Sequence, residues 1–73
     1  MNRTEIENLF TYHPPFGSQP DRYIEIRQMA LEFALRLEEL CPPSDERKEA
    51  IRHIDYAVMR ANASIARHET EEQ

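Results

Sequence analysis

The fold of this chain is decided by residues 18–44, which read SQPDRYIEIRQMALEFALRLEELCPPS. Apolar side chains recur in this stretch in alternating steps of three and four, the spacing of one face of an amphipathic helix. These positions are Tyr23, Ile26, Ala30, Phe33, Leu37 and Leu40. Ser18 can cap such a helix, Pro20 suits its first turn, and the two prolines after Cys41 end it. The pattern predicts a helix over residues 18–40.

The same spacing recurs after the paired prolines. Ser44 can cap a second helix, and Asp45 and Glu46 favour the positive end of its dipole. The apolar residues that follow are Ile51, Ile54, Val58, Ala61 and Ile65. We expect this helix to span residues 44–68. Two helices joined by a tight Pro-Pro-Ser turn predict an antiparallel hairpin, and therefore an all-α single domain over residues 1–73.

The two ends of the chain are expected to be less regular. Residues 4–7, TEIE, fit a capping box, so one or two helical turns are predicted over residues 4–9. The stretch 10–17, FTYHPPFG, is expected to be extended, because a residue before proline is pushed out of the α region. After His68 the chain becomes acidic, and residues 69–73 are expected to form a frayed tail.

The composition limits the classes of function. Lys and Arg number 9 against 14 Asp and Glu, a formal net charge of −5 at pH 7, which argues against bulk capture of DNA or RNA. The single cysteine, Cys41, excludes an internal disulfide and a cysteine-based zinc site, and is expected to be a small apolar group at the turn. Apolar runs are short, so we expect neither a membrane span nor a secretory leader.

A second apolar stripe on the first helix predicts a partner surface. Ile24, Leu31 and Leu35 lie opposite the first seam, and a two-helix hairpin buries only one stripe per helix. A chain this short also buries only about 60% of its unfolded surface, which favours self-association. We expect these three residues to form a subunit interface; scattered surface leucines are the alternative.

A basic stripe lies on the second helix, opposite its apolar seam. Its members are Arg52, Tyr56, Arg60, Ala63 and Arg67. Guanidinium groups bind phosphate in a bidentate manner and stack on flat rings. Arg52 has Glu49 and Asp55 nearby, so a solvated face accounts for it. Arg60 and Arg67 have no carboxylate four residues away. For these two, phosphate binding and a solvated face both remain open.

Catalysis and metal binding have little support in the sequence. His13, His53 and His68 are scattered, and none pairs with a nucleophile or with another histidine at metal-ligand spacing. The single glycine cannot build a phosphate-binding loop. We therefore expect a protein that is not an enzyme and that uses neither a metal nor a cofactor.

The aromatic lead-in, residues 10–16, is a feature that a hairpin does not need in order to fold. Phe10 and Phe16 are expected to plug the open end of the hairpin. Tyr12 and His13 alternate with them in an extended chain and can face away, presenting rings and hydrogen-bond donors. Ring stacking beside an arginine suits a small phosphorylated nucleotide.

Four motifs occur in a fixed order along the chain. They are FTYHPP at 10–15, RYIEIR at 22–27, CPPSDER at 41–47 and AVMRANASIAR at 57–67. As a set, they resemble the phage anti-CBASS nucleotide-sponge family, whose hairpin domain is shared with the phage anti-Thoeris sponge. The resemblance covers most of the chain.

The resemblance implies a helical homo-oligomer, typically a hexamer built as a trimer of dimers. It implies that the protein binds cyclic oligonucleotide signals of bacterial immunity in the host cytoplasm and sequesters them without cleavage. A cyclic dinucleotide would lie between two protomers, held by Tyr12 and Arg27, with His13 as a further candidate. The family often has lysine where this chain has Arg27.

The resemblance also implies a separate threefold pocket for cyclic trinucleotides. Arg67 matches the basic residue near the end of the second helix that lines this pocket, and Asn62 and Ser64 are nearby polar candidates.

Two other classes of function remain as alternatives. One is a protein-interaction module, in which the stripe of Ile24, Leu31 and Leu35 docks a host helix and Tyr12 is a binding hot spot. The other is an enzyme such as a phosphodiesterase.

Overall fold

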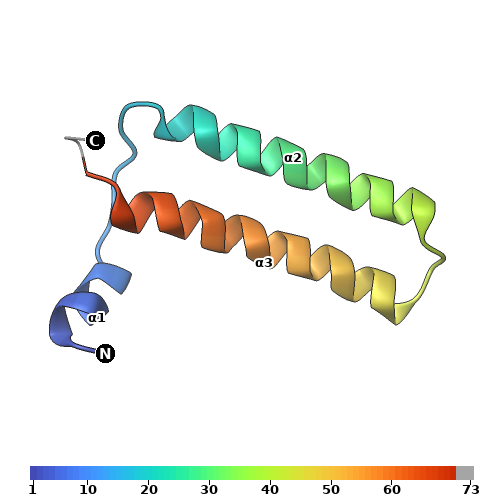
Figure 1. Ribbon diagram of the computed structural model, residues 1–73, viewed down its shortest axis with the longest axis horizontal. Coiled ribbons are helices and arrows are strands. Elements are labelled where there is room, and N and C mark those ends of the chain that lie inside the picture. Colours follow the sequence, from blue (N-terminus) through green and yellow to red (C-terminus); the bar gives the residue numbers. More distant parts are fainter. Residues whose placement is uncertain (71–73) are drawn as a thin grey trace.

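The computed structural model describes residues 1–70, and it is a helical hairpin with a short helix in front of it (Figure 1). The helices are α1 (Arg3–Leu9), α2 (Gln19–Leu40) and α3 (Asp45–His68), and no strand occurs within residues 1–70. The predicted all-α hairpin is confirmed. The N-terminus and α1 lie at the open end of the hairpin, where α2 begins and α3 ends.

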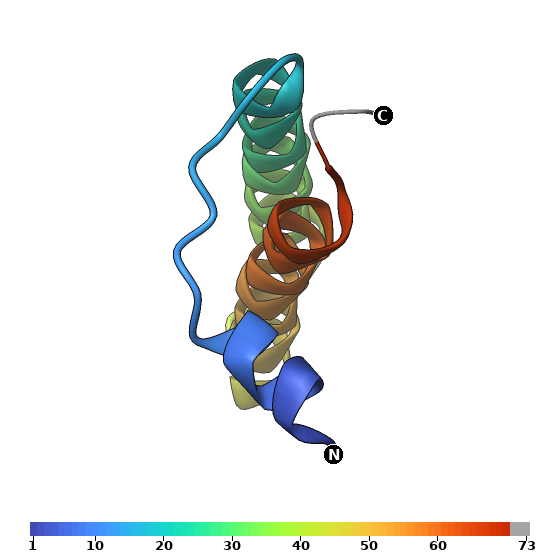
Figure 2. The same cartoon turned by 90° about the vertical axis from the view of Figure 1, so that its left-hand side faces the viewer.

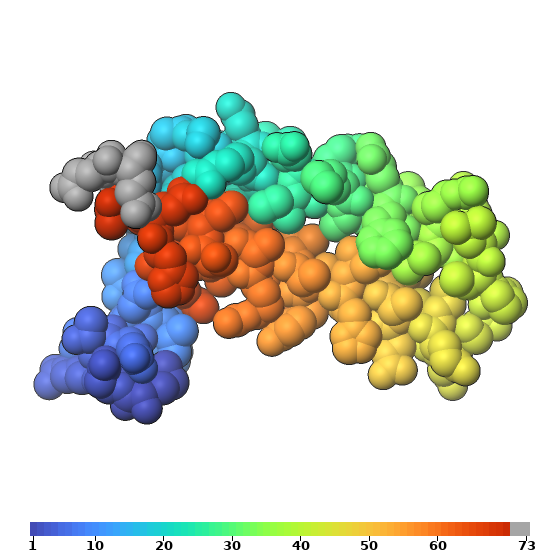
Figure 3. All heavy atoms as spheres, viewed as in Figure 1, coloured from blue at the N-terminus to red at the C-terminus, as the bar shows by residue number. Residues whose placement is uncertain are grey.

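The N-terminal helix begins earlier than the sequence predicted. Asn2 caps α1: its side-chain oxygen accepts the Glu5 N–H at 2.8 Å, and the Glu5 carboxylate accepts the Asn2 N–H at 3.3 Å. The capping box therefore begins at Asn2 and not at Thr4, because asparagine caps a helix as well as serine or threonine does. In Figure 3, α1 forms a separate lobe at the open end.

The start of α2 also differs from the prediction. Ser18 precedes the helix but makes no capping hydrogen bond; its hydroxyl accepts a hydrogen bond from Arg22 Nε at 3.0 Å instead. Pro20 lies in the first turn, as predicted. Gly17 has a φ of 56°, a left-handed conformation that glycine adopts without strain, and it lets the chain turn sharply into the helix.

The turn between α2 and α3 is closed by hydrogen bonds. Ser44 caps α3 as predicted, since its side chain accepts the Arg47 N–H at 3.1 Å. Arg47 Nη1 donates to the carbonyls of Glu38 and Cys41, both at 3.1 Å. These carbonyls belong to the last turn of α2 and its cap, so Arg47 satisfies acceptors that the helix cannot satisfy itself.

The contact between α2 and α3 is only half-buried. On α2 the inward positions are Tyr23, Ile26, Ala30, Ala34, Leu37 and Cys41. The prediction was wrong for Leu40, which is 62% exposed. Phe33, which is 56% exposed, lies only at the edge of the contact with α3. The inward positions keep to the ~3.6 residues per turn of a straight helix, whereas the predicted seam followed the shorter repeat of a supercoil, and the two drift apart along α2.

The described residues of the single chain form no hydrophobic core. Within the described residues no apolar side chain is fully buried, and the one buried side chain is that of Gln19. The predicted interface residues are all exposed: Ile24 by 60%, Leu31 by 52% and Leu35 by 54%. No helix within residues 1–70 is long and apolar enough to cross a membrane.

An apolar groove of about 450 Å³ runs between the two long helices. Its lining residues are Ile26, Met29, Ala30, Phe33, Ile54, Ala57, Val58 and Ala61. Three of these residues are alanines, whose small side chains leave space in the groove for a large apolar side chain.

Candidate functional site

The lead-in passes from α1 to α2 beside the end of α3 (Figure 2). The end of α1 and the first half of the lead-in make hydrogen bonds with neighbouring backbone and with α3. Asn8 Nδ2 donates to the Arg67 carbonyl at 3.2 Å, and His13 Nε2 lies 3.1 Å from the Asn8 carbonyl. A carbonyl only accepts, so His13 Nε2 carries the proton of this hydrogen bond. Arg67 Nη2 donates in turn to the Leu9 carbonyl at 3.5 Å.

The two phenylalanines of the lead-in do not behave alike. Phe16 is half-buried at the start of α2, as expected of a plug. Phe10 is 85% exposed, so the prediction that it plugs the hairpin was wrong. It caps α1, and α1 stands away from the long helices.

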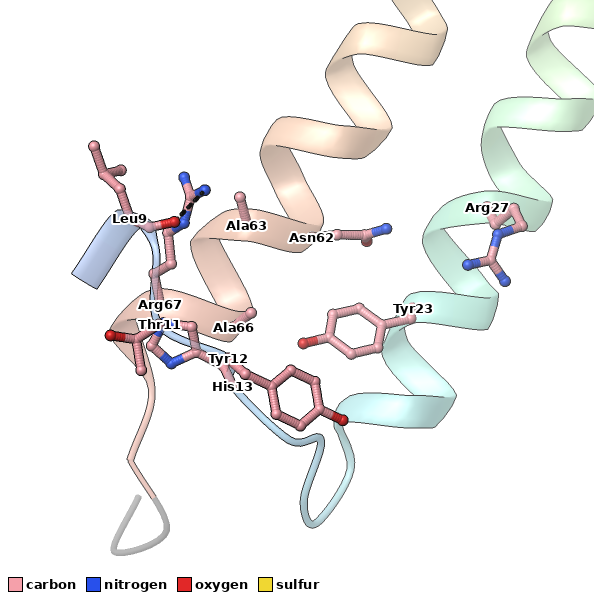
Figure 4. Close-up of a pocket in the computed structure, with 10 residues that line it drawn as sticks. All are labelled: Leu9, Thr11, Tyr12, His13, Tyr23, Arg27, Asn62, Ala63, Ala66 and Arg67. Carbon is pink, nitrogen blue, oxygen red and sulfur yellow. Dashed lines mark hydrogen bonds between the residues drawn. The ribbon is translucent and has the colours of Figure 1, made fainter. Parts of the chain in front are cut away.

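A cavity of about 350 Å³ lies where the lead-in meets the two long helices (Figure 4). The lead-in and α1 contribute Leu9, Thr11, Tyr12 and His13; α2 contributes Tyr23 and Arg27; α3 contributes Asn62, Ala63, Ala66 and Arg67. The cavity thus joins segments that are about fifty residues apart in the chain.

Most of the sequence-predicted ligand residues meet at this cavity. Tyr12, His13 and Arg27 were assigned to a dinucleotide site, and Asn62 and Arg67 to a trinucleotide site; all five line its wall. Ser64 does not line it and is exposed elsewhere on α3. Within one protomer, the residues predicted for two ligand classes therefore share one cavity.

Arg27 presents to the cavity a positive charge that has no partner within residues 1–70. Its side chain makes no hydrogen bond or ion pair with any residue of the described chain. Its neighbours one turn away on α2 are Tyr23, Ile24, Ala30 and Leu31, and none of them is acidic. A free guanidinium on a rigid helix can bind a phosphate through two parallel hydrogen bonds.

Arg67 supplies a second guanidinium on the opposite wall. It is half-buried, and its one hydrogen bond goes to a backbone carbonyl, so within residues 1–70 no carboxylate neutralises it. Among residues 1–70, no acidic residue lines the cavity. The cavity is therefore positive in a chain whose net charge is −5.

Asn62 lies between the two arginines with an unfulfilled hydrogen-bond capacity. Its side chain points from α3 toward α2 in Figure 4. Its Oδ1 atom is buried and has no hydrogen-bond partner among the described residues. Leaving such an acceptor unpaired costs about 1–3 kcal/mol, and a ligand donor or a rotation of the amide would remove this cost.

Aromatic rings complete the wall. The Tyr12 side chain is 81% exposed and extends from the lead-in toward α2. Tyr23 was assigned to the apolar seam, yet its ring also lines the cavity. Its position one turn before Arg27 on the same helix was the signal that could have identified it. Ala63, a member of the predicted basic stripe, and Ala66 also line the cavity with small side chains.

Gln19, Arg22 and Glu69 form a polar cluster next to this site, which we call the clasp. Arg22 Nη1 and Nη2 donate to the two Glu69 carboxylate oxygens at 2.7 and 2.6 Å. Gln19 Nε2 donates to Glu69 Oε1 at 3.1 Å. The hydrogen bonds from Arg22 and Gln19 lower the pKa of Glu69 from its ordinary value of 4.5 to about 2. Glu69 is therefore fixed, although a frayed tail was expected from this residue onward; residues 71–73 lie outside the described residues.

The fold and the cavity define a small helical-hairpin protein with a positive, ring-lined pocket at its open end. The chain belongs to the Acb2/Tad1 hairpin-domain family, whose model matches residues 1–66. The resemblance to the anti-CBASS and anti-Thoeris sponges is thereby confirmed. No curated protein and no solved structure matches the chain. Within residues 1–70, no group of three or more His, Cys, Asp or Glu side chains is placed to hold a metal ion.

Proposed function

We propose that this protein binds cyclic di- and trinucleotide signals of bacterial anti-phage immunity and sequesters them intact in the cytoplasm of the host. Family membership supports this class of function, because the family is one of phage sponges for such signals. The observation that carries the proposal for this chain is the cavity, where two arginines that have no acidic partner among residues 1–70 line the wall together with the exposed ring of Tyr12.

The chemistry of the lining suits a cyclic dinucleotide. Such a ligand has two phosphates and two flat bases. Arg27 would pair with a phosphate, and the exposed Tyr12 ring would stack on a base, an interaction worth about 1–3 kcal/mol per base. His13 would support Tyr12, since its ring is hydrogen-bonded to the Asn8 carbonyl and holds the lead-in beside α3.

A trinucleotide would use the residues near the end of α3. Arg67 and Asn62 would contact it from the cavity side, and Ser64 from the exposed side of the helix. Repetition of Arg67 around a symmetry axis would concentrate positive charge where three copies meet.

Sequestration fits the groups that line the cavity. The hydroxyl of Thr11 donates to the Glu7 carbonyl at 2.6 Å and is not aligned with a base. The residues of the wall bind anions and rings, but they supply no nucleophile paired with a base. A ligand held there would leave unchanged.

The proposal includes self-association into a homo-oligomer, with a hexamer as the expected size. A protomer with no fully buried apolar side chain among its described residues needs further burial to be stable. The exposed stripe of Ile24, Leu31 and Leu35 is one proposed interface. The apolar groove between α2 and α3 offers a second surface on the same protomer.

The same exposed stripe favours one alternative function, a module that docks a host protein helix. The sponge and the protein-docking module differ in what the purified protein binds, a nucleotide or a host protein. A stable oligomer that ignores host proteins and binds nucleotide supports the sponge.

Isothermal titration of the purified protein with 3′,3′-cyclic GMP-AMP tests the proposal. We expect saturable binding, with a stoichiometry that counts the pockets per oligomer. No heat with this ligand, with cyclic trinucleotides or with cyclic ADP-ribose isomers would overturn the proposal and leave the protein-docking alternative.

A further inference from the structure

Gln19 is unusual for a polar residue at the start of a helix, because it is 1% exposed. Its amide is fully used. Gln19 Oε1 accepts the Phe16 N–H at 3.2 Å, and Nε2 donates to the Ile65 carbonyl at 3.4 Å and to Glu69 Oε1 at 3.1 Å. One side chain thus links the lead-in, α2 and the end of α3.

The Arg22–Glu69 pair adds a charged bond at the same point. The pair is bidentate, and the two side chains are 38% and 29% exposed, so the pair is partly shielded from water. Bidentate arginine–carboxylate pairs fix orientation as well as distance. The low pKa of Glu69, about 2, keeps this carboxylate charged at every physiological pH.

Two residues of the clasp, and the Phe16 to which Gln19 is bonded, are close in sequence to residues that line the cavity. Phe16 is four residues after Tyr12, Arg22 is five residues before Arg27, and Glu69 is two residues after Arg67. The lead-in is held at its other end by the bonds of Asn8 and His13. Tyr12 therefore lies on a segment that is tied down on both sides, although its own ring is exposed.

We propose that Gln19, Arg22 and Glu69 are positioning residues for the nucleotide site, which hold the lead-in so that Tyr12 stands ready opposite Arg27. This inference rests on the proposed function. A tethered lead-in is ordered before the ligand arrives. Without the clasp the ligand has to order it, and the lost conformational entropy is subtracted from the affinity.

The chain offers a matched pair of variants. Glu69→Gln removes the charge of the clasp and puts an amide donor against the donors of Arg22 or Gln19. Glu39→Gln makes the same change in the Arg36–Glu39 pair, which is 2.7 Å long and lies near the other end of the hairpin. Its side chains are 63% and 67% exposed, and neither residue lines the cavity.

The two full-length variants are compared by titration with 3′,3′-cyclic GMP-AMP, by amide hydrogen exchange and by sedimentation. We expect Glu69→Gln to bind about tenfold more weakly, because it must order the lead-in on binding, and to exchange the Phe16 amide faster. Its oligomer should be unchanged, and Glu39→Gln should match the wild type throughout. Arg22→Lys keeps the charge but loses the bidentate geometry, so its affinity for the nucleotide should lie between that of the wild type and that of Glu69→Gln.

The outcomes separate this inference from the proposed function. If the wild type does not bind the nucleotide, the proposed function is overturned, and the positioning role falls with it. If the wild type binds and Glu69→Gln binds equally well, the clasp alone is overturned. Weaker binding that comes only with loss of the oligomer, in both Glu69→Gln and Arg22→Lys, would also overturn the positioning role and make the clasp a structural contact.

Discussion

Arg27 has the simplest surroundings of any charged residue at the cavity. It lies on α2 one turn after Tyr23, and no carboxylate within the described chain forms an ion pair with it. The other cavity arginine, Arg67, is half-buried and bonded to a backbone carbonyl. The two residues therefore differ in freedom, and their roles can be separated by single substitutions.

Replacing Arg27 with alanine should remove most of the affinity for 3′,3′-cyclic GMP-AMP. A charge-assisted hydrogen bond contributes about 1.5–3 kcal/mol, which is roughly 10- to 100-fold in affinity. The oligomer should be unaffected. Titration of Arg27→Ala is compared with titration of Arg60→Ala, which removes an exposed arginine of α3 that does not line the cavity. Equal binding by Arg27→Ala and the wild type would show that the phosphate is held elsewhere.

Replacing Arg67 with alanine should weaken the binding of a cyclic trinucleotide and spare that of the dinucleotide. The structure makes this a demanding test, because Arg67 and Arg27 line the same cavity of one protomer. Direct titration and competition experiments with both ligands would measure the affinity of Arg67→Ala for each of them. If Arg67→Ala loses both ligands together, the protein has one shared pocket and the division into two sites is wrong.

At the scale of the element, the open end of the hairpin is where α1, the lead-in, α2 and α3 are joined by polar bonds. The side chain of Asn8 in α1 donates to a backbone carbonyl in the last turn of α3, and the clasp joins that same end to the start of α2. The other end is closed by Arg47 on the carbonyls of α2. Both ends of a hairpin without a full core are thus secured by hydrogen bonds.

The clasp predicts a pH dependence of stability. The pKa of Glu69 is about 2 in the folded chain and 4.5 ordinarily, so the folded state prefers the charged carboxylate. Its stabilisation is complete above about pH 5 and is lost as the pH falls from 4.5 toward 2. Thermal unfolding of the wild type and of Glu69→Gln should differ at neutral pH and converge near pH 2. A difference in melting temperature that stays constant down to pH 2 would contradict the lowered pKa.

The elements were predictable from local rules, but their details depend on contacts across the hairpin. The spacing of the apolar side chains and the positions of the prolines predicted both long helices. The same spacing misplaced Leu40 and put Phe33 in the centre of a contact at whose edge it lies, since only the contact with α3 decides which side of α2 faces inward. Glu69 gave no local signal, because its partners Gln19 and Arg22 lie about fifty residues away in the chain.

The candidate site was predictable to a similar degree. Family motifs identified Tyr12, Arg27 and Arg67 as separate residues, and all three line the cavity. That one cavity collects them could not be predicted, because it depends on how the lead-in folds back beside α3. Tyr23 was missed since an aromatic residue in an apolar seam is ordinarily explained by packing.

At the scale of the whole molecule, the single chain is long and thin, 45 × 29 × 15 Å, and exposes many large apolar side chains. Such a shape has too much surface for its volume to bury a core. The proposed assembly would supply the missing burial and would place several copies of the cavity around one centre.

Replacing Leu31 with glutamate should break this assembly. Leu31 is 52% exposed in the protomer, so the charge is tolerated there but not within an apolar interface. We expect sedimentation to give a smaller species, with most helicity retained by circular dichroism. His53→Glu adds the same carboxylate at an exposed position of α3 and should leave the oligomer intact. An unchanged oligomer for Leu31→Glu would exclude this stripe from the interface.

The measurement that tests sequestration most directly is a release experiment. The protein is mixed with a small excess of binding sites over 3′,3′-cyclic GMP-AMP, filtered, then boiled, and the nucleotide in each fraction is identified by chromatography. We predict that the first filtrate contains almost no nucleotide and that boiling releases it unchanged. Free nucleotide in the first filtrate, or a linear product after boiling, would contradict the account.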